Sequence, residues 1–577
     1  MRIDPIPVLA PTSRFNRTKS RLLNLATLCV VAVLALGAAG CTKRATRVAL
    51  GNKEQVLHFG NYAEPADLDP QSVSGVPEFH ILKALFEGLV MADPKDLSPV
   101  PGVAERWEVS PDGLLYTFHL RANANWSDGQ PVTADDFVRS FERILSPALA
   151  APYADMLYAL AGAEEYNAGK LKDFSKVGVK ALDPKTLQVT LRGPTPYFLL
   201  MLNHHAWFPS PMRVIDKFGS RYSKGNRWTR PGNIVSNGPF VLKDWRVNDE
   251  IVVVKNEKYW DASKVRLKEV RFYPINSTDV EERAFRAGQL HVSNSLPPSK
   301  IDTYRAAGSS TLRIEPHYSN AYYAVNVDPK KQTNPALLDL RVRRALTMAV
   351  DRESLVKNVI RAGQTPAYSF IPPGPGGYEA RKLVSYDPEG ARRLLAEAGF
   401  PGGQGVPKIS ILINTSELLR SIAEAVQQMW KKELGIDVEI VNQEWKVYLA
   451  AQNNLDYQIC RAGWTADYVD PSTFFDLMRA RTGNNNTGYS NPAFEQRVID
   501  SLSAPDAPAR ARMLQEAEDM LMTDLPVIPL YFNTRWYLLQ PSVKGWYPNF
   551  LDDHSLKEVY LENEAIPSDT PPPSNAY

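Results

Sequence analysis

The stretch over residues 408–440, KISILINTSELLRSIAEAVQQMWKKELGIDVEI, decides the fold class. Residues 408–413 form an apolar run of strand length. Over residues 416–434, apolar side chains recur at helical spacing, at Leu419, Ile422, Ala423, Val426, Met429, Trp430 and Leu434. Gly435 is placed to end that helix, and alternating apolar residues over 436–440 then indicate a second strand. This β-α-β succession predicts an α/β domain, in which ligands bind at strand ends.

The next predicted strand of this domain ends in a mixture of side chains that a core strand does not need. The apolar run over residues 457–460 leads directly into RAGWTADY, residues 461–468. Arg461 supplies a cation, Trp464 an aromatic ring and Asp467 a carboxylate. A small zwitterionic ligand needs all three, because its ammonium, its carboxylate and its apolar face each require a partner. We therefore predict a ligand site at this strand end.

Composition narrows the class of protein. A chain of 577 residues exceeds one ordinary core, so we expect two or three domains. Hydrophobic content of 44% and charged content of 23% are typical of a soluble globular protein. The net charge of +2, from 66 basic and 64 acidic residues, argues against a nucleic-acid binder, which shows a clear basic excess.

Residues 1–40 have the pattern of a signal peptide. Four basic residues precede a nearly apolar run over residues 22–40: Arg14, Arg17, Lys19 and Arg21. We expect cleavage before Cys41 and acylation of that cysteine, so that residues 41–55 tether the protein to a membrane surface at the periplasm or cell surface. The alternatives are an ordinary secretory signal, giving a soluble periplasmic protein, and an uncleaved anchor, since the run is barely long enough to span a bilayer.

Motifs of catalysis and of cofactor binding are missing. The chain has no GxxxxGK[ST] loop, no HExxH or CxxC pair and no GxSxG nucleophile elbow. We therefore expect a non-enzymatic protein without a cofactor or metal. The pair His204-His205 has no carboxylate beside it in sequence and is expected to be structural. Cys460 remains the single cysteine after the signal and the acylated residue, and a small buried strand residue is its best interpretation.

The N-terminal half contains strand pairs and helices of its own. Apolar runs flank Pro111-Asp112-Gly113, and Asp-Gly between such runs is a strong hairpin signal. Thr133 and Asp136 have the spacing of a capping box for a helix over residues 134–144. Further helices are expected over residues 79–90, 280–287, 336–349 and 353–361, and further strands over residues 185–191, 237–242, 251–254 and 270–274.

Motifs in a fixed order resemble those of one family. They are Leu68-Asp69-Pro70, Phe86-Glu87-Gly88-Leu89, Trp126-Ser127-Asp128-Gly129, Ser236-Asn237-Gly238-Pro239-Phe240, Tyr259-Trp260-Asp261, Arg341-Val342-Arg343-Arg344-Ala345-Leu346, Leu394-Leu395-Ala396-Glu397-Ala398-Gly399-Phe400, Asn442-Gln443-Glu444-Trp445 and the stretch over 461–468. Together they resemble the solute-binding proteins of ABC peptide importers, extracellular family 5, oligopeptide-binding branch. The resemblance covers nearly all of the chain after the signal. It implies capture of oligopeptides for a membrane permease by a monomeric receptor.

The same resemblance implies a fold: an α/β, periplasmic-binding-protein-like two-lobe hinged trap of class II type, with an extra inserted domain and three domains in all. The expected limits are a signal over 1–40, a tether over 41–55, domain I over 56–86, 213–321 and 535–567, domain II over 87–212, domain III over 322–534, and a disordered tail over 568–577.

The resemblance also implies roles for individual residues. Asp467 matches the carboxylate that holds the ligand's α-ammonium, against the alternative of a capping aspartate. Arg461 matches a position used for the ligand's terminal carboxylate, against an internal ion pair. Trp464 and Trp445 match pocket aromatics, and Tyr153 matches a tyrosine that contacts ligand main chain; core packing is the alternative for each. Backbone contacts with an extended peptide are implied for Ser74, Gly75, Val76, Gly463, Trp464 and Thr465.

Two positions depart from the branch. Leu419 and Gln452 stand where basic residues often occur, which leaves the accepted peptide length open. Other ligands for the same fold, such as a dipeptide, a cell-wall peptide, a metal chelate, haem or a sugar, therefore stay as alternatives. Two further alternatives are a secreted hydrolase and a receptor that signals or acts as a chaperone without transport.

Overall fold

The structure is a computed structural model that describes residues 45–374, 378–480, 482–504 and 506–563. By contact pattern the chain divides into residues 1–46 and residues 47–577. The expected signal peptide, Cys41 and the whole expected C-terminal tail over 568–577 lie outside the described residues. Part of the expected tether is a helix, α2 (Arg47–Glu54), because Val48, Gly51 and Asn52 are buried and Val48 N donates to Gly288 O at 2.9 Å.

A four-stranded sheet combines a strand near the start of the described chain with three strands from its middle. Its order is β1 (Val56–Gly60), β10 (Glu269–Tyr273), β9 (Glu250–Lys255) and β8 (Phe240–Arg246), with β1 parallel to β10 and the other neighbours antiparallel. β8 and β9 confirm the strands expected over residues 237–242 and 251–254. Segments far apart in sequence therefore share one sheet, and β-branched residues in β9 (EIVVVK) suit its buried position.

A second four-stranded sheet lies between these segments in sequence. Its order is β4 (Ala104–Val109), β5 (Leu115–Leu120), β7 (Thr186–Thr190) and β6 (Val179–Asp183). The β4–β5 hairpin confirms the Asp-Gly turn, in which Gly113 has a φ of +69°. Helix α4 (Ala134–Leu145) begins at the predicted capping box: Thr133 Oγ1 accepts from Asp136 N at 3.3 Å and Asp136 Oδ2 accepts from Thr133 N at 2.8 Å.

The third sheet is the predicted α/β domain. Its order is β12 (Thr365–Pro366), β16 (Val527–Leu538), β11 (Leu312–Val325), β15 (Ile459–Thr465), β13 (Ile409–Asn414) and β14 (Val438–Gln443). Strands β13 and β14 are parallel and joined by α13 (Glu417–Leu434), which confirms the β-α-β prediction. Ser416 caps the start of α13, and Gly435 ends it in the left-handed region with a φ of +71°.

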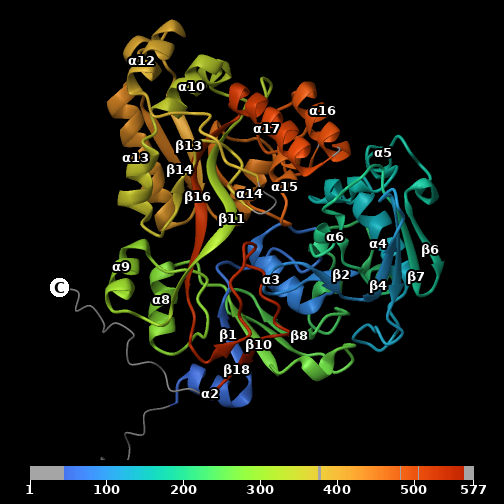
Figure 1. The fold of residues 1–577 in the computed structure, drawn as a ribbon. Helices are drawn as coiled ribbons and strands as arrows, with labels where there is room; N and C mark the ends of the chain where they lie inside the picture. The colour runs from blue at the N-terminus through green and yellow to red at the C-terminus, as the bar shows by residue number, and fades with distance from the viewer. Residues whose placement is uncertain (1–44, 375–377, 481, 505, 564–577) are drawn as a thin grey trace, which may run out of the picture. The chain divides into compact units, whose positions relative to one another are not determined.

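Two long strands connect this domain with the first sheet (Figure 1). β11 and β16 pair over most of their length, with register shifts after Pro316 and Ala321. Just beyond β16, Leu539 bridges to Val292, which in turn bridges to Phe59 of β1. The antiparallel pair β11–β16 is therefore the main covalent and hydrogen-bonded passage between the two parts.

Helices surround the three sheets. They are α3 (Val76–Leu85), α5 (Ala163–Asn167), α6 (Phe198–Met201), α7 (Met212–Ile215), α8 (Thr278–Arg286), α9 (Pro298–Ala306), α10 (Leu340–Met348), α11 (Arg352–Ser354), α12 (Pro388–Glu397), α14 (Trp445–Asn453), α15 (Ser472–Asp476), α16 (Pro492–Asp500) and α17 (Ala507–Asp524). Short strands β2 (Val90–Ala92), β3 (Pro99–Pro101), β17 (Val543–Lys544) and β18 (Tyr560–Leu561) form two small ribbons.

Three helix predictions differ from the structure in their limits. The helix expected over 336–349 is a 3₁₀ turn followed by α10, because Asp339 caps α10 by accepting from Arg341 N at 2.8 Å. The helix expected over 353–361 is α11 followed by a π-helical turn over Leu355–Ile360. The helix expected over 79–90 is α3, which starts earlier because Pro77 suits a first helical turn.

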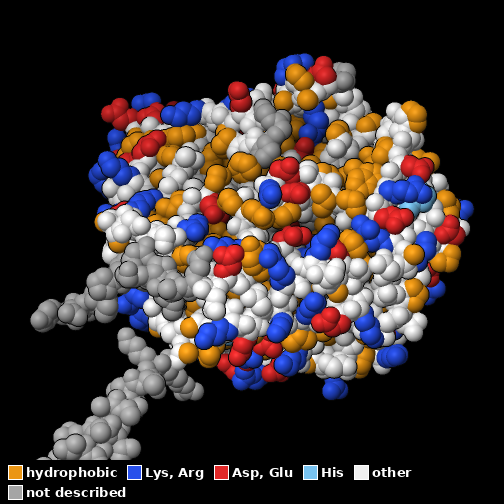
Figure 2. All heavy atoms as spheres, turned by 60° about the horizontal axis from the view of Figure 1, so that its bottom comes forward, with side chains coloured by type: hydrophobic (Ala, Val, Ile, Leu, Met, Phe, Trp, Pro, Cys, Tyr) orange, Lys and Arg blue, Asp and Glu red, His pale blue; other side chains and the backbone are white. Residues whose placement is uncertain are grey.

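Surface charge follows the balanced composition. On the face drawn in Figure 2, basic and acidic side chains are interspersed rather than gathered into a stripe of one sign. Across the described parts of the chain, no helix has both the length and the apolarity that a bilayer crossing requires.

Candidate functional site

Strand β15 has an unpaired edge. It pairs with β11 from Ile459 to Thr465 on one side. On the other side β13 pairs with Ile459 and Cys460 alone. No neighbouring strand within the described chain therefore covers the edge over residues 461–465, and an uncovered edge is a template for another extended chain.

The backbone groups along this edge alternate in direction. Trp464 N donates to Asn320 Oδ1 at 3.0 Å and Ala466 N donates to Tyr318 O at 2.9 Å, both toward β11. Because successive residues in a strand alternate, the N–H and C=O groups of Gly463 and Thr465 point away from β11, toward the open edge. Both residues were predicted to offer their backbone to a ligand.

Asp467 lies just past the end of β15, held by neutral donors. Tyr153 OH donates to Oδ1 at 3.2 Å, and Thr473 Oγ1 donates to Oδ2 at 3.2 Å. His204 Nε2 lies 3.5 Å from Oδ1. Since His204 Nδ1 accepts from Ala206 N at 3.2 Å, the neutral imidazole carries its proton on Nε2, facing the carboxylate.

This carboxylate has no cationic partner. Its side chain is 11% exposed, and no described Lys or Arg forms an ion pair with it. Burial raises the pKa of Asp467 to about 8, and the hydrogen bonds from Thr473 and Tyr153 offset this only in part. Burial also lowers the pKa of His204 well below its usual range, so that ring stays neutral. The site therefore lacks one positive charge.

Arg461 occupies the other end of the open edge. Its Nε donates to Asn414 Oδ1 at 2.8 Å, and its guanidinium carbon lies 5.5 Å from the centre of the Tyr448 ring and 6.0 Å from that of Trp445. Among the described residues no carboxylate pairs with it. The open edge thus has an unpaired cation, Arg461, at one end and an unpaired buried carboxyl, Asp467, at the other. A zwitterionic ligand would find a partner for each of its two charges there.

A pocket of about 150 Å³ opens beside this edge. It is lined by residues of β11, α13, β15 and β16: Asn320, Ala321, Tyr322, Tyr323, Leu419, Ile422, Arg461, Ala462, Gly463, Leu530, Tyr531 and Asn533. Arg461 and Gly463 are the predicted site residues that line it. Asp467, Trp464 and Tyr153 form the separate cluster at the far end of the strand.

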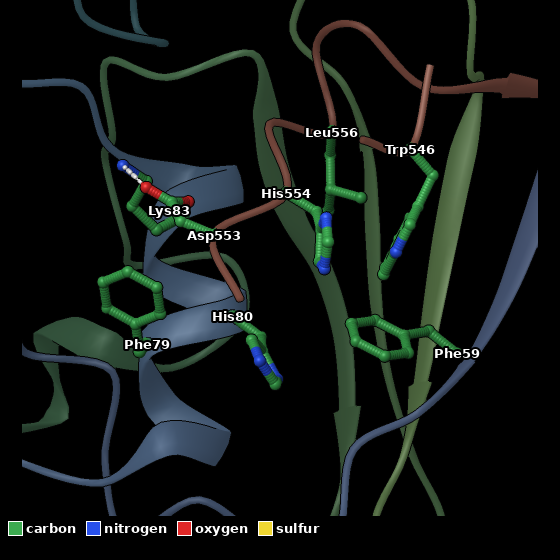
Figure 3. Close-up of a pocket in the computed structure, with 8 residues that line it drawn as sticks. All are labelled: Phe59, Phe79, His80, Lys83, Trp546, Asp553, His554 and Leu556. Carbon is green, nitrogen blue, oxygen red and sulfur yellow. Dashed lines mark ion pairs between the residues drawn. The ribbon is translucent and has the colours of Figure 1, made fainter. Parts of the chain in front are cut away.

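A second pocket is too small for a peptide. Figure 3 shows it between side chains of α3, including His80, and the C-terminal segment with Trp546 and His554. Its volume is about 10 Å³, about the size of one water molecule. The ion pair between Lys83 Nζ and Asp553 Oδ2, at 3.0 Å, lies at its side. This pocket is a small gap in packing and contains none of the predicted site residues.

Comparison with known proteins places the chain. Residues 98–486 match the family model of bacterial extracellular solute-binding proteins, family 5 middle. The periplasmic oligopeptide-binding protein OppA of Salmonella typhimurium is 37% identical over 560 residues, covering 95% of this chain and 98% of that one. The chain belongs to family 5 of the bacterial extracellular solute-binding proteins.

Solved structures of family 5 proteins share its fold. The Haemophilus influenzae OppA in complex with RPPGFSPFR has a TM-score of 0.82 at 32% identity, covering 88% of this chain and 99% of that one. MppA, a murein tripeptide binding protein in its unliganded open form, reaches 0.62 at 35% identity, covering 88% and 98%. The chain thus has the α/β, two-lobed periplasmic-binding fold with an additional domain, and its lobes are arranged more like those of the peptide complex.

The other predicted residues differ in their surroundings. Trp464 Nε1 donates to Thr473 Oγ1 at 3.3 Å, which helps to hold the Asp467 cluster. Trp445 begins α14 and stacks on Tyr448, with ring centres 5.7 Å apart. Ser74 and Val76 are exposed at the start of α3, which Gly75 precedes. A Cβ at Gly75 would meet Glu78 Oε2 at 2.1 Å, so a larger residue there would displace the buried Glu78 carboxyl.

The structure also corrects the interpretation of one loop residue and adds another. Of the His204-His205 pair, His205 is structural, with Nδ1 2.6 Å from Pro70 O, but His204 contacts the Asp467 cluster. Tyr62, from a distant part of the sequence, accepts from Asn414 Nδ2 at 3.0 Å, and its φ of +59° is a strained conformation for a tyrosine. No local sequence signal could have found it, because its partners are hundreds of residues away.

Three further groups of residues near the edge are not ligand partners. Asp470 accepts from Ser472 N at 3.0 Å and pairs with Arg510 at 2.7 and 2.8 Å, so its role is structural. Cys460 is buried in β15, and burial raises the pKa of its thiol to about 12, which makes it unreactive. In the described ranges, no group of three His, Cys, Asp or Glu residues is arranged to hold a metal ion.

Proposed function

We propose that this family 5 protein is the extracytoplasmic receptor of an ABC importer that captures oligopeptides and delivers them to a membrane permease. The observation that carries the proposal is a buried carboxyl without a cation, Asp467, at the end of an open strand edge. A peptide ammonium supplies the missing positive charge. The name of the Salmonella relative, an oligopeptide-binding protein, supports the same ligand class.

The charges at the two ends of the edge fix the direction of the ligand. With its ammonium at Asp467 and its carboxylate toward Arg461, the peptide runs antiparallel to β15. Gly463 and Thr465 then exchange backbone hydrogen bonds with it, which gives affinity independent of peptide sequence. On the opposite side of the peptide we assign the backbone of Ser74, Gly75 and Val76, and we assign Tyr153, Trp464 and Trp445 to its surroundings.

No reaction is part of this proposal. The hydroxyl of Tyr153, the hydroxyl of Thr473 and the imidazole of His204 all direct protons at Asp467. That arrangement stabilises a bound ion pair. We accordingly assign the chain a binding role, without a cofactor, rather than that of a hydrolase.

We further propose the cellular location and the domain organisation expected from the sequence. Cleavage before Cys41 and its acylation would hold a monomeric receptor at the periplasmic or cell-surface side of a membrane. The three-domain limits stated above belong to the same proposal. The three sheets support them, since each sheet draws its strands mainly from one proposed domain.

The test of the proposed function is Asp467→Asn, which keeps the size and removes the charge. We expect the affinity for peptides with a free amino end to fall by about 30- to several-thousand-fold, because a buried ion pair loses one partner at a cost of about 2–5 kcal/mol. Affinity for N-acetylated peptides should change little. Titration calorimetry with both peptide sets measures the difference.

A matched control is Asp456→Asn, which removes a carboxylate outside the site. Both variants should keep the thermal unfolding midpoint of the wild type within a few degrees. Equal losses for free and acetylated peptides in Asp467→Asn would remove Asp467 from the role of ammonium partner. Failure of the wild type to bind any peptide would remove the proposed function itself.

A further inference from the structure

The 150 Å³ pocket is an apolar cavity next to a site for charged ligand ends. Leu419, Ile422 and Leu530 contribute aliphatic side chains, and Tyr323 and Tyr531 contribute rings. A cavity of about 150 Å³ is large enough to hold a benzene ring. Among the described residues that line the pocket, Arg461 is the only charged one. A lysine or arginine side chain of a ligand would therefore enter it without a carboxylate partner.

Leu419 is directed to this pocket rather than to a core. Its neighbour Leu418 packs against the apolar core under α13, and so does Ile422. Leu419 belongs to none of the four apolar cores, yet it lines the pocket. An apolar side chain that a protein keeps half-exposed at the wall of a cavity is available to an apolar partner.

The strand register shows which ligand residue reaches the pocket. Gly463 lies opposite Ala321 and Arg461 opposite Tyr323, so Gly463 faces the same side of the sheet as Ala321 and Tyr323, the side covered by α13. In an antiparallel pair, residues that exchange backbone hydrogen bonds oppose each other and alternate along the strand. A ligand whose first residue opposes Thr465, within reach of Asp467, places its third residue opposite Gly463. The side chain of that third residue points into the pocket.

We propose that this pocket selects the third residue of the ligand, favouring a large apolar or aromatic side chain, and that Leu419 is its main specificity-determining residue. The inference rests on the proposed peptide-binding function and deepens it. In a tripeptide the same residue carries the terminal carboxylate, which the register brings toward Arg461. The favoured ligands are therefore tripeptides that end in a large apolar residue.

The test compares tripeptides that differ at one position, by titration calorimetry on the full receptor. The peptides are three alanines, two alanines followed by phenylalanine, two alanines followed by lysine, and phenylalanine followed by two alanines. We expect phenylalanine at the third position to bind about 10- to 100-fold more tightly than alanine, from burial of its ring. Lysine there should not exceed alanine, and phenylalanine at the first position should gain less than at the third.

A paired variant connects the preference to Leu419. Leu419→Asn keeps a similar size but makes the wall polar, and we expect the third-position preference, the ratio of the affinities for the phenylalanine and the three-alanine peptides, to fall to a few-fold. Arg420→Ala is the control, since Arg420 is exposed beside Leu419 and pairs with Glu424 at 3.0 Å on the outer face of α13. It should keep the full preference. Thermal unfolding checks that both variants are folded.

The possible outcomes separate the inference from the function. If the tripeptides bind with no third-position preference, or if Leu419→Asn keeps the full preference, the pocket inference is overturned and peptide binding stands. If no tripeptide with a free amino end binds, and longer free peptides also fail, the proposed function and the inference are overturned together.

Discussion

Asp467 is a carboxylate that the protein surrounds with hydrogen bonds but does not neutralise. Three neutral donors hold its orientation, while burial raises its pKa to about 8. By contrast, Asp552 is buried beside Arg535 and His554, and these neighbours hold its pKa well below the usual range despite burial. Asp552 thus has a cationic partner in the protein. Asp467 has none and also lies at the end of an open strand edge, and it is this combination that points to a ligand.

Arg461 gives a prediction at the opposite end of the ligand. Arg461→Gln should weaken binding of tripeptides with a free carboxylate by about 10-fold or more, because a charge-assisted hydrogen bond is worth roughly 1.5–3 kcal/mol. Tripeptide amides should lose much less. Calorimetry on acid and amide forms of one peptide checks this, with Arg420→Gln as the control. An equal loss for both forms would assign Arg461 to internal packing against Trp445 and Tyr448.

Residues of the site were predictable from sequence to different degrees. Asp467, Arg461 and Gly463 lie within one contiguous stretch, so their proximity needs only a strand. Thr473 joins them from α15, a few residues after Asp467, whereas His204 and Tyr62 join them through loops from parts of the chain that meet this region only in the folded protein. Loop contacts of this kind depend on domain packing, which residue patterns do not specify.

At the level of elements, the site exists because β13 separates from β15 after two residue pairs. The β-α-β unit that the sequence predicted is present, but the position at which neighbouring strands diverge is not visible in apolar periodicity. It depends on where the loop after β13 turns toward α13, at Thr415 and Ser416. Thr415 N donates to Gln443 O at 2.9 Å, which directs the chain toward β14 and away from β15.

The open edge makes a prediction that leaves the protein unchanged. Methylation of the ligand's third amide nitrogen removes the donor that faces Gly463 O, and each hydrogen bond contributes about 0.5–1.5 kcal/mol, so affinity should fall by about 2- to 10-fold. The second amide nitrogen faces away from β15, so its methylation tests the contacts assigned to the opposite side of the peptide. The loss of affinity on methylation of the third nitrogen should also occur in Asp467→Asn, since the Gly463 and Asp467 contacts are separate. If third-position methylation has no effect, the ligand does not extend β15.

At the level of the whole molecule, the lobes of this structure are closed on a carboxyl that lacks its partner. In the proposed domain limits Tyr153 belongs to domain II and Asp467 to domain III, and Asn484 Nδ2 donates to Pro152 O at 3.2 Å beside them. Asp155 lies in the same contact, where burial and the nearby Asp476 raise its pKa to about 7. In an opened form both carboxyls would be hydrated and would return toward ordinary pKa values.

Closure without a ligand should therefore depend on pH. Both pKa values are raised in the closed form, so closure takes up protons between about pH 4 and pH 8 and is favoured as pH falls through that window. Each group changes the closed-to-open ratio by at most about tenfold per pH unit. His204 stays neutral and Tyr153 stays protonated over this range, because burial shifts their pKa values away from it.

Small-angle scattering of the ligand-free protein measures this closure directly. The radius of gyration should decrease between pH 8 and pH 5, and Asp467→Asn should make the protein more closed at pH 8 and weaken the pH dependence to that of Asp155. A bound peptide should keep the protein closed at both pH values, because its ammonium lets Asp467 ionise inside the closed lobes. The contrary result is a ligand-free radius of gyration that is the same at pH 5 and pH 8, in both wild type and Asp467→Asn. It would show that the buried carboxyl does not oppose closure. Pairing of the peptide ammonium with Asp467 would then not be what closes the receptor.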